Sequence, residues 1–258
     1  MIGRIIVDGF KFGFSLRRML PYIFLNFLFL YTICDMFGRI VPLEITPEAI
    51  ASIAPICGLY FFVFLFFIIS QPLLIAVMLH QAKNFGKKIS MKKSFEFAFS
   101  IFFKSFSILI VLAVVYIFLT LVPFLGLVLI LLFALASFYT YPAAIMDNKN
   151  IVESFKKSFS IFRRAPLQTF MIVFLIASIT FILTIISFSP LMFWLFNNFY
   201  ALYQQTQNTT ILTQYLIKLL VSPTILPFLL IPSIAVAFCQ VMKIGMMARL
   251  YSALKKRA

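Results

Sequence analysis

Long apolar segments alternate with short polar segments along this chain. Residues 56–79 and 107–146 each exceed the run of about 18 apolar residues that is typical of a membrane-spanning helix. The runs lack the period-two polarity of membrane barrel strands, and backbone in lipid must satisfy its own hydrogen bonds. The pattern therefore predicts an all-α membrane protein with six spans, at about 21–37, 50–82, 105–122, 126–146, 166–190 and 223–242.

Three shorter amphipathic segments precede the odd-numbered spans, at residues 2–19, 91–102 and 151–164. In the third segment, one helical face carries apolar residues and the opposite face is polar. The apolar residues are Ile151, Phe155, Phe159 and Phe162, and the first segment repeats the arrangement with Ile2, Ile6, Phe10 and Phe14. Segments of this kind are typical of helices that lie in the membrane interface.

Local signals predict where several elements begin and end. Ser90 and Thr46 are candidate N-caps, and Pro21 and Pro166 suit the first turn of a span. Pro55 and Pro72 predict kinks in the second span. The fifth span is expected to end near Pro190, before an external segment of residues 190–222. Trp194, Tyr200 and Tyr203 in that segment suit a headgroup-level helix or a lid. A basic cytoplasmic tail is expected after the sixth span.

Composition and charge agree with a membrane protein. Hydrophobic residues make up 63% of the chain and charged residues 11%, against about 45–50% and about 25% in soluble domains. The net charge is +15, and 20 of the 22 Lys and Arg residues fall within residues 4–18, 83–104, 149–164 and 243–257. The positive-inside rule places these four patches in the cytoplasm, together with both termini. Because the charges serve this purpose and accompany no binding module, nucleic acid is not expected as a partner.

An internal repeat is suggested by the three amphipathic segments. A shift of 60 residues aligns Ser94, Phe95 and Phe99 with Ser154, Phe155 and Phe159, and a shift of 145 aligns Phe10 and Phe14 with the same phenylalanines. We expect a single membrane domain, 1–258, built of three parallel units at about 2–85, 88–148 and 150–250, each an interfacial helix followed by a transmembrane hairpin. Chance matching in a chain with 35 phenylalanines is the alternative.

Two groups of residues are candidates for binding. The first group lies at the ends of the interfacial segments, where basic residues could bind anionic lipid headgroups or only fix the topology: Arg17, Arg18, Lys104, Arg163 and Arg164. The second group comprises polar residues within spans, which could form interhelical hydrogen bonds or a polar path for a substrate: Asn26, Gln71, Thr140, Thr180 and Gln240.

Reactive chemistry is sparse in the sequence. His80 is the single histidine, and Cys34, Cys57 and Cys239 have no metal-ligand or paired spacing. No metalloprotease, nucleophile-elbow, P-loop or dinucleotide motif occurs. We therefore expect no enzymatic activity, no metal and no cofactor.

The region from the VPFLG turn at residues 122–126 through YPAAIMDNKNIVESFKKSFSIFRR to the closing MARLYSALKK resembles the YciC-type inner-membrane proteins. It is also similar to the related membrane domain that precedes glycerophosphodiester phosphodiesterase catalytic domains. The resemblance implies six spans and no transferable catalytic residues, and the phosphodiesterase barrel itself is absent from the sequence.

Two functions are compatible with these features. The first is a non-enzymatic protein of the cytoplasmic (inner) membrane that binds anionic lipids, organises the envelope or assists other membrane proteins. The alternative is a transporter or lipid-handling protein that moves a small or amphipathic molecule through the helix bundle.

Overall fold

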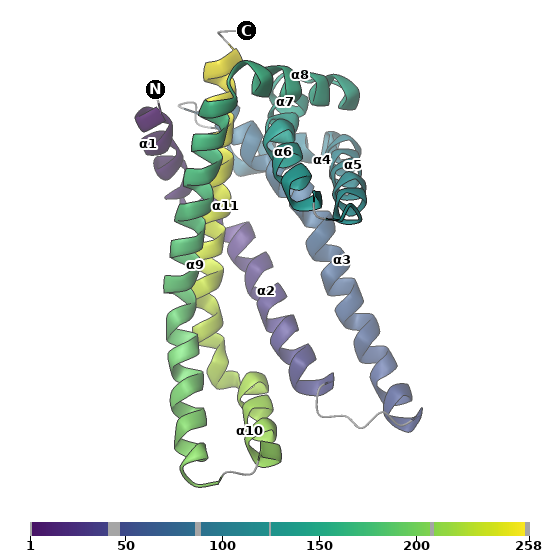
Figure 1. Ribbon diagram of the computed structural model, residues 1–258, viewed down its shortest axis with the longest axis vertical. Helices are drawn as coiled ribbons and strands as arrows, with labels where there is room; N and C mark the ends of the chain where they lie inside the picture. Colours follow the sequence, from purple (N-terminus) through teal and green to yellow (C-terminus); the bar gives the residue numbers. More distant parts are fainter. Residues whose placement is uncertain (1, 41–46, 86–88, 124, 207–208, 256–258) are drawn as a thin grey trace. The chain divides into compact units, whose positions relative to one another are not determined.

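The computed structural model describes residues 2–40, 47–85, 89–123, 125–206 and 209–255, which form helices and connecting turns with no strand among them. Figure 1 shows the elements along the chain. They are α1 (Ile2–Gly13), α2 (Leu16–Ile40), α3 (Pro47–Lys83), α4 (Met91–Ser100), α5 (Phe102–Thr120), α6 (Gly126–Ser137), α7 (Thr140–Met146), α8 (Ile151–Arg164), α9 (Pro166–Tyr203), α10 (Thr209–Val221), the 3₁₀ turn η1 (Pro223–Ile225) and α11 (Leu226–Lys255).

Six helical segments of the described chain are long and apolar enough to cross a membrane. Their number and approximate positions confirm the six predicted apolar helices. The segments are Leu16–Arg39, Ala54–Lys83, Phe102–Thr120, Gly126–Met146, Pro166–Tyr203 and Pro223–Lys255.

Several predicted boundaries are wrong because helices continue through proline. Pro21 is the sixth residue of α2 rather than part of its first turn. Helix α3 is continuous through Pro55 and Pro72, and the kinks predicted there remain predictions. The fifth span does not end near Pro190, since α9 continues to Tyr203 and includes Trp194 and Tyr200. Thr46, the predicted N-cap of the second span, lies outside the described residues.

A serine compensates for the proline inside α9. Pro190 lacks the N–H that would bond to the carbonyl of Ile186, but the Ser189 hydroxyl donates to that carbonyl over 2.8 Å. Such re-satisfaction of backbone groups is how helices tolerate proline in an apolar environment.

The fourth span is two helices rather than one, because the chain breaks at Phe138 and Tyr139 between α6 and α7. Pro142 removes the N–H that would bond to the carbonyl of Phe138. The Ser158 hydroxyl, from α8, donates to the Ala136 carbonyl over 2.5 Å and accepts the Tyr139 N–H over 3.0 Å. A side chain of the third interfacial helix therefore satisfies the backbone of the break.

The chain divides into two compact units. Unit 1 comprises Met1–Met19, Ile69–Ile179 and Phe238–Ala258, and unit 2 comprises Leu20–Ile68 and Thr180–Ala237. Within unit 2, Phe29 of α2 stacks on Phe67 of α3 at 4.2 Å. Leu191 of α9, Ile225 of η1 and Leu229 of α11 form a buried cluster in the same unit.

The core of unit 1 forms around the end of α11, which the sequence predicted as a basic tail. Met242, Met246, Leu250 and Tyr251 are fully buried there. Apart from its charged residues this segment is almost entirely apolar, and most of its side chains are buried. Ala76–Leu79 of α3 and Ala143–Ile145 of α7 are also buried in unit 1.

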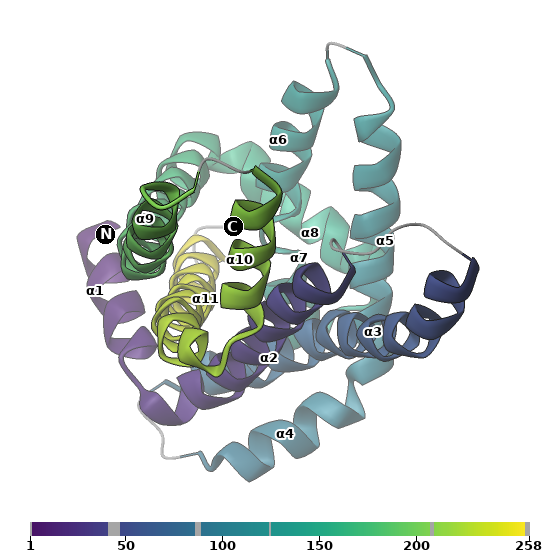
Figure 2. The same ribbon diagram turned by 90° about the horizontal axis from the view of Figure 1, so that it is seen from below.

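The second span pair lies wholly in unit 1, where α5 and α6 run side by side on either side of a short turn (Figure 2). The Tyr116 and Phe133 rings pack edge to face at 5.4 Å. A Cβ on Gly126 would lie 2.6 Å from the Leu119 carbonyl oxygen, so the turn requires glycine at this close approach.

Candidate membrane-interface site

The three helices predicted to lie in the membrane interface are α1, α4 and α8, and all belong to unit 1. Side-chain caps begin two of them: Ser90 accepts the Lys93 N–H over 3.3 Å and Asn150 accepts the Glu153 N–H over 2.8 Å. The predicted cap at Ser90 is confirmed. The first helix ends at Gly13, earlier than the predicted Met19, because Ser15 interrupts it before α2 begins at Leu16.

Each of these helices packs through a pair of small residues four positions apart. The pairs are Gly9 and Gly13 in α1, Ser94 and Ala98 in α4, and Ser154 and Ser158 in α8, and all six residues are buried. Small residues allow close approach of helices in membrane proteins. The phenylalanine stripe predicted as the apolar face is therefore not the packing face.

Contacts of the small residues show how tightly the helices are held. A Cβ on Gly13 would lie 2.8 Å from Cε2 of Phe238 in α11. The hydroxyl of Ser94 accepts a hydrogen bond from Gln81 Nε2 over 2.8 Å and lies 3.1 Å from His80 Nδ1, both on α3. The Ser158 hydroxyl bonds to the Ala136 carbonyl and the Tyr139 N–H, where the helix is interrupted between α6 and α7.

A phenylalanine directly follows the second small residue of each pair, and these phenylalanines are exposed. Phe14, Phe99 and Phe159 are 74%, 63% and 41% exposed, and Phe103 is 82% exposed. The polar residues of α8 occupy the other flank, where Glu153 forms an ion pair with Lys149 at 3.4 Å. Each helix thus packs on the protein through its small residues. Exposed apolar side chains lie on one side of this contact and polar side chains on the other.

The five predicted headgroup residues divide into two groups. Arg17, Arg163 and Arg164 are exposed at the helix ends. Arg18 instead donates to the Phe12 carbonyl over 3.2 Å, and its guanidinium lies 4.1 Å from the centre of the Phe12 ring. Lys104 donates to Asn148 Oδ1 over 3.1 Å. Arg18 and Lys104 therefore have partners within the protein.

A polar network surrounds the end of α7. Asp147 accepts hydrogen bonds from Tyr251 over 2.7 Å and from Lys255 over 2.6 Å. Lys83 of α3 donates to the Met146 carbonyl over 2.6 Å. Cations at a helix C-terminus offset its exposed carbonyls and macrodipole. Together with Lys104, the network links α3, α5 and α11 to one helix end.

The Asp147 carboxyl remains charged in this network. Burial raises its pKa, but the hydrogen bonds from Lys255 and Tyr251 and the charges of Lys255 and Lys157 lower it by more. The net result is a pKa below the ordinary value for aspartate. The following residue, Asn148, has a positive φ of 55°, which asparagine tolerates better than most residues.

The polar residues predicted within the spans lie in both units. Asn26 and Thr180 belong to unit 2, whereas Gln71, Thr140 and Gln240 belong to unit 1. Asn26 and Thr140 are buried. Gln71 Nε2 and Thr140 Oγ1 are buried without a hydrogen-bond partner in the structure. A polar path for a substrate through these residues remains a prediction.

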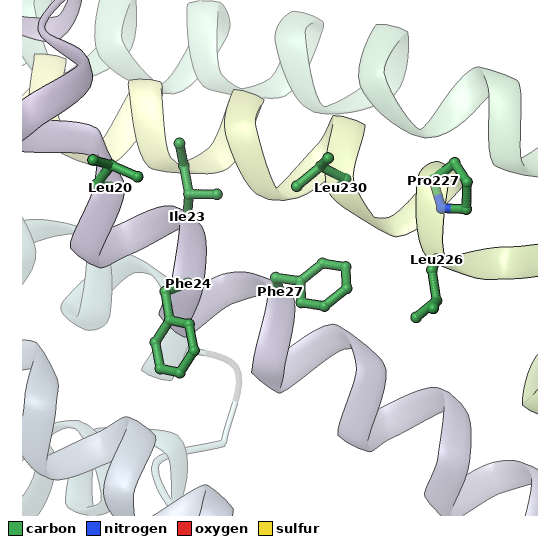
Figure 3. Close-up of a pocket in the computed structure, with 7 residues that line it drawn as sticks. All are labelled: Leu20, Ile23, Phe24, Phe27, Leu226, Pro227 and Leu230. Carbon is green, nitrogen blue, oxygen red and sulfur yellow. The ribbon is translucent and has the colours of Figure 1, made fainter. Parts of the chain in front are cut away.

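Unit 2 contains an apolar groove of about 490 Å³ between α2 and the start of α11 (Figure 3). Its volume falls within the roughly 300–1,000 Å³ that is typical of small-molecule sites. Apolar residues line it, namely Leu20, Ile23, Phe24, Phe27, Leu226, Pro227 and Leu230.

Among the described residues, no three His, Cys, Asp or Glu side chains are grouped as metal ligands would be. His80 stacks on Phe97 at 4.4 Å and contacts Ser94, so it is part of the packing between α3 and α4.

The helices and their apolar surfaces define the class of the protein, a multi-pass α-helical membrane protein. The chain has no significant match to a known protein family, to a characterised protein or to a solved structure. The resemblance to YciC-type proteins thus remains a prediction from the sequence.

Sequence reasoning missed the small-residue pairs and the Asp147 network. The pairs could have been found, since glycine, serine or alanine recurs with a spacing of four at the same place in all three segments. The partners of Asp147 had no local signal, because Tyr251 and Lys255 are more than 100 residues away in the sequence.

Proposed function

We propose that the protein is a non-enzymatic, multi-pass component of the cytoplasmic membrane that binds anionic lipids at its cytoplasmic face. It serves there in membrane organisation or as an accessory to other membrane proteins. The observation that carries this proposal is the exposure of Arg163 and Arg164 at the end of α8 and of Arg17 at the start of α2, next to helices whose flanks expose phenylalanine. Each basic residue near an anionic surface contributes about 1 kcal/mol.

The proposed architecture is three parallel repeats, each an interfacial helix followed by a transmembrane hairpin. The packing within span pairs and the small-residue pairs of α1, α4 and α8 support it. Gly9, Ser94 and Ser154 correspond under the sequence shifts that align the phenylalanines, and so do Gly13, Ala98 and Ser158. A repeat explains why the same edge of each helix is buried, whereas chance matching of phenylalanines does not.

Lipid retention tests this function. The purified protein, in mixed micelles with equal phosphatidylglycerol and phosphatidylcholine, is compared with the Arg17→Glu/Arg163→Glu variant by native mass spectrometry. The variant is expected to retain several-fold less phosphatidylglycerol than the wild-type protein. Lys218→Glu, a charge reversal at an exposed residue of α10, is the matched control and should retain the wild-type amount. Equal retention by all three proteins would refute the proposal.

A second candidate function, lipid handling, is favoured by the groove in unit 2. Its apolar lining suits a single acyl chain. Leu230→Trp would fill the groove and is expected to slow transfer of a fluorescent phospholipid between vesicles that contain the protein. The same substitution at exposed Leu127 is the control. Wild-type protein that transfers no lipid would exclude this function.

A further inference from the structure

The exposed phenylalanines of the three interfacial helices occupy one register. Phe14, Phe99 and Phe159 are separated by the same intervals as the buried small pairs, so each directly follows the second residue of its pair. Phe99 and Phe159 lie within α4 and α8, and Phe14 directly follows the last residue of α1. All three are exposed, at 74%, 63% and 41%. In a helix that docked through its apolar stripe, these rings would be buried.

Two of the three rings also have equivalent neighbours. Val7 and Val152, seven residues or about two helical turns before Phe14 and Phe159, are 50% and 62% exposed. In α4 the corresponding residue is Lys92, and Glu96 lies where α1 and α8 have lysine. Basic Lys11 and Lys156 are exposed on the other side of this flank. Exposed aromatic and aliphatic groups bordered by lysine are the composition of helices that insert into an anionic membrane surface.

The polar flank faces away from this surface. Lys93 and Glu153 are equivalent residues of α4 and α8, and both are exposed. They lie six residues before Phe99 and Phe159, which places them about 120° around the helix from the rings. A membrane surface that contacts the phenylalanines would leave these residues in water.

We propose that Phe14, Phe99 and Phe159 insert into the boundary between the headgroups and acyl chains of one leaflet, as three equivalent anchors. The occupant of this surface is lipid, argued from its exposed apolar area, its bordering lysines and its attachment to membrane-spanning helices. The inference rests on the proposed function for the placement of the basic helix ends at the membrane. It adds that insertion of the aromatic rings, rather than charge alone, sets the depth of the three helices in the membrane.

The chain is well suited to a fluorescence test because Trp194 is its single tryptophan. Trp194→Phe preserves an aromatic ring at the stack on Phe228, which is 5.1 Å away. In this background, Phe14→Trp, Phe99→Trp and Phe159→Trp are compared with Lys93→Trp and Glu153→Trp in nanodiscs that contain brominated phosphatidylcholine. Thermal unfolding and gel filtration confirm that each variant is folded before its fluorescence is used.

The tryptophans at 14, 99 and 159 are expected to emit at shorter wavelength than the two controls. They should also be quenched several-fold more by brominated lipid and several-fold less by aqueous acrylamide. Tryptophan as accessible to acrylamide as the controls at any of the three positions would overturn the three-anchor proposal.

The two proposals fail separately. The nanodiscs contain only zwitterionic lipid, so insertion of the rings is measured without the anionic headgroups that the proposed function requires. Inserted rings together with unchanged phosphatidylglycerol retention in Arg17→Glu/Arg163→Glu would uphold the anchors and reject anionic selectivity. Rings exposed to water together with reduced phosphatidylglycerol retention would reject the anchors and uphold anionic selectivity.

Discussion

Asp147 joins the end of α7 to two residues of α11 that are more than 100 positions away in the sequence. Replacement by alanine leaves Tyr251 without its acceptor and Lys255 without its counter-ion. Hydrogen bonds to a charged group contribute about 1.5–3 kcal/mol, and we expect Asp147→Ala to lower the free energy of unfolding by about that amount. Thermal unfolding in detergent measures the change. Glu96→Ala, which removes an exposed carboxylate from α4, is the control and should leave the midpoint unchanged.

The lowered pKa of Asp147 also predicts a pH dependence. The folded pKa lies below the unfolded value, so the stabilisation is fully present above the unfolded pKa of about 3.9. It is lost as the pH falls through the folded pKa. The stability difference between wild type and Asp147→Ala should thus be constant from neutral pH to mildly acidic pH and shrink below that. A difference that grows on acidification would contradict the assignment.

Ser158 combines two roles, because its small side chain allows α8 to approach and its hydroxyl bonds to the break between α6 and α7. Ser158→Ala keeps the size but leaves the Tyr139 N–H without its acceptor, and should cost about 1–3 kcal/mol. Ser160→Ala, on the polar flank of the same helix, should stay within about 0.5 kcal/mol of wild type. Chemical unfolding followed by circular dichroism compares them, and equal stability of the two variants would count against the bridging role.

At the scale of elements, periodicity and length were enough to predict six apolar helices and three amphipathic ones. The interruptions were harder to predict because they depend on tertiary partners. Pro190 lies inside a continuous helix since Ser189 bonds to the freed carbonyl, whereas Pro142 lies beside a break that Ser158 satisfies. Proline alone does not distinguish these outcomes.

The end of α11 illustrates a second limit of sequence reasoning. Its lysines and arginines correctly mark the basic end of the chain, but they do not reveal that the apolar residues between them form a core. Met242, Met246 and Leu250 are buried by segments far away in the sequence. Charge alone identified the basic residues of the candidate site. The sequence could not show that Arg18 bonds to the Phe12 carbonyl or that Lys104 bonds to Asn148.

Two glycines provide an element-level prediction. Gly126→Ala places a Cβ 2.6 Å from backbone at Leu119, so the α5–α6 turn must shift at a cost of about 1–3 kcal/mol. Gly58 lies inside α3 with nothing within 4 Å of such a Cβ, and Gly58→Ala should be neutral or stabilising by up to about 1 kcal/mol. Thermal melts of the two variants should move in opposite directions or differ clearly, and equal losses would contradict the packing of the turn.

At the scale of the whole molecule, the proposed function requires the six apolar helices to cross the membrane and the three amphipathic helices to lie on its cytoplasmic side. The basic patches and the exposed arginines support that assignment. Under this proposal the amphipathic helices lie at the leaflet surface, where small residues pack them on unit 1 and phenylalanines contact lipid. Three segments that are similar in sequence would thus share one role, attachment to the membrane surface.

Cysteine accessibility in sealed, oriented membrane vesicles shows whether the three amphipathic helices lie on one side of the membrane. In a background with Cys34, Cys57 and Cys239 replaced by alanine, single cysteines are introduced at Lys11, Lys93, Glu153 and Gln205, all exposed. An impermeant maleimide should label the first three only from the cytoplasmic side and the cysteine at 205 only from the opposite side. Labelling of α1, α4 or α8 from the side that labels residue 205 would contradict the six-span arrangement with its three helices on one face.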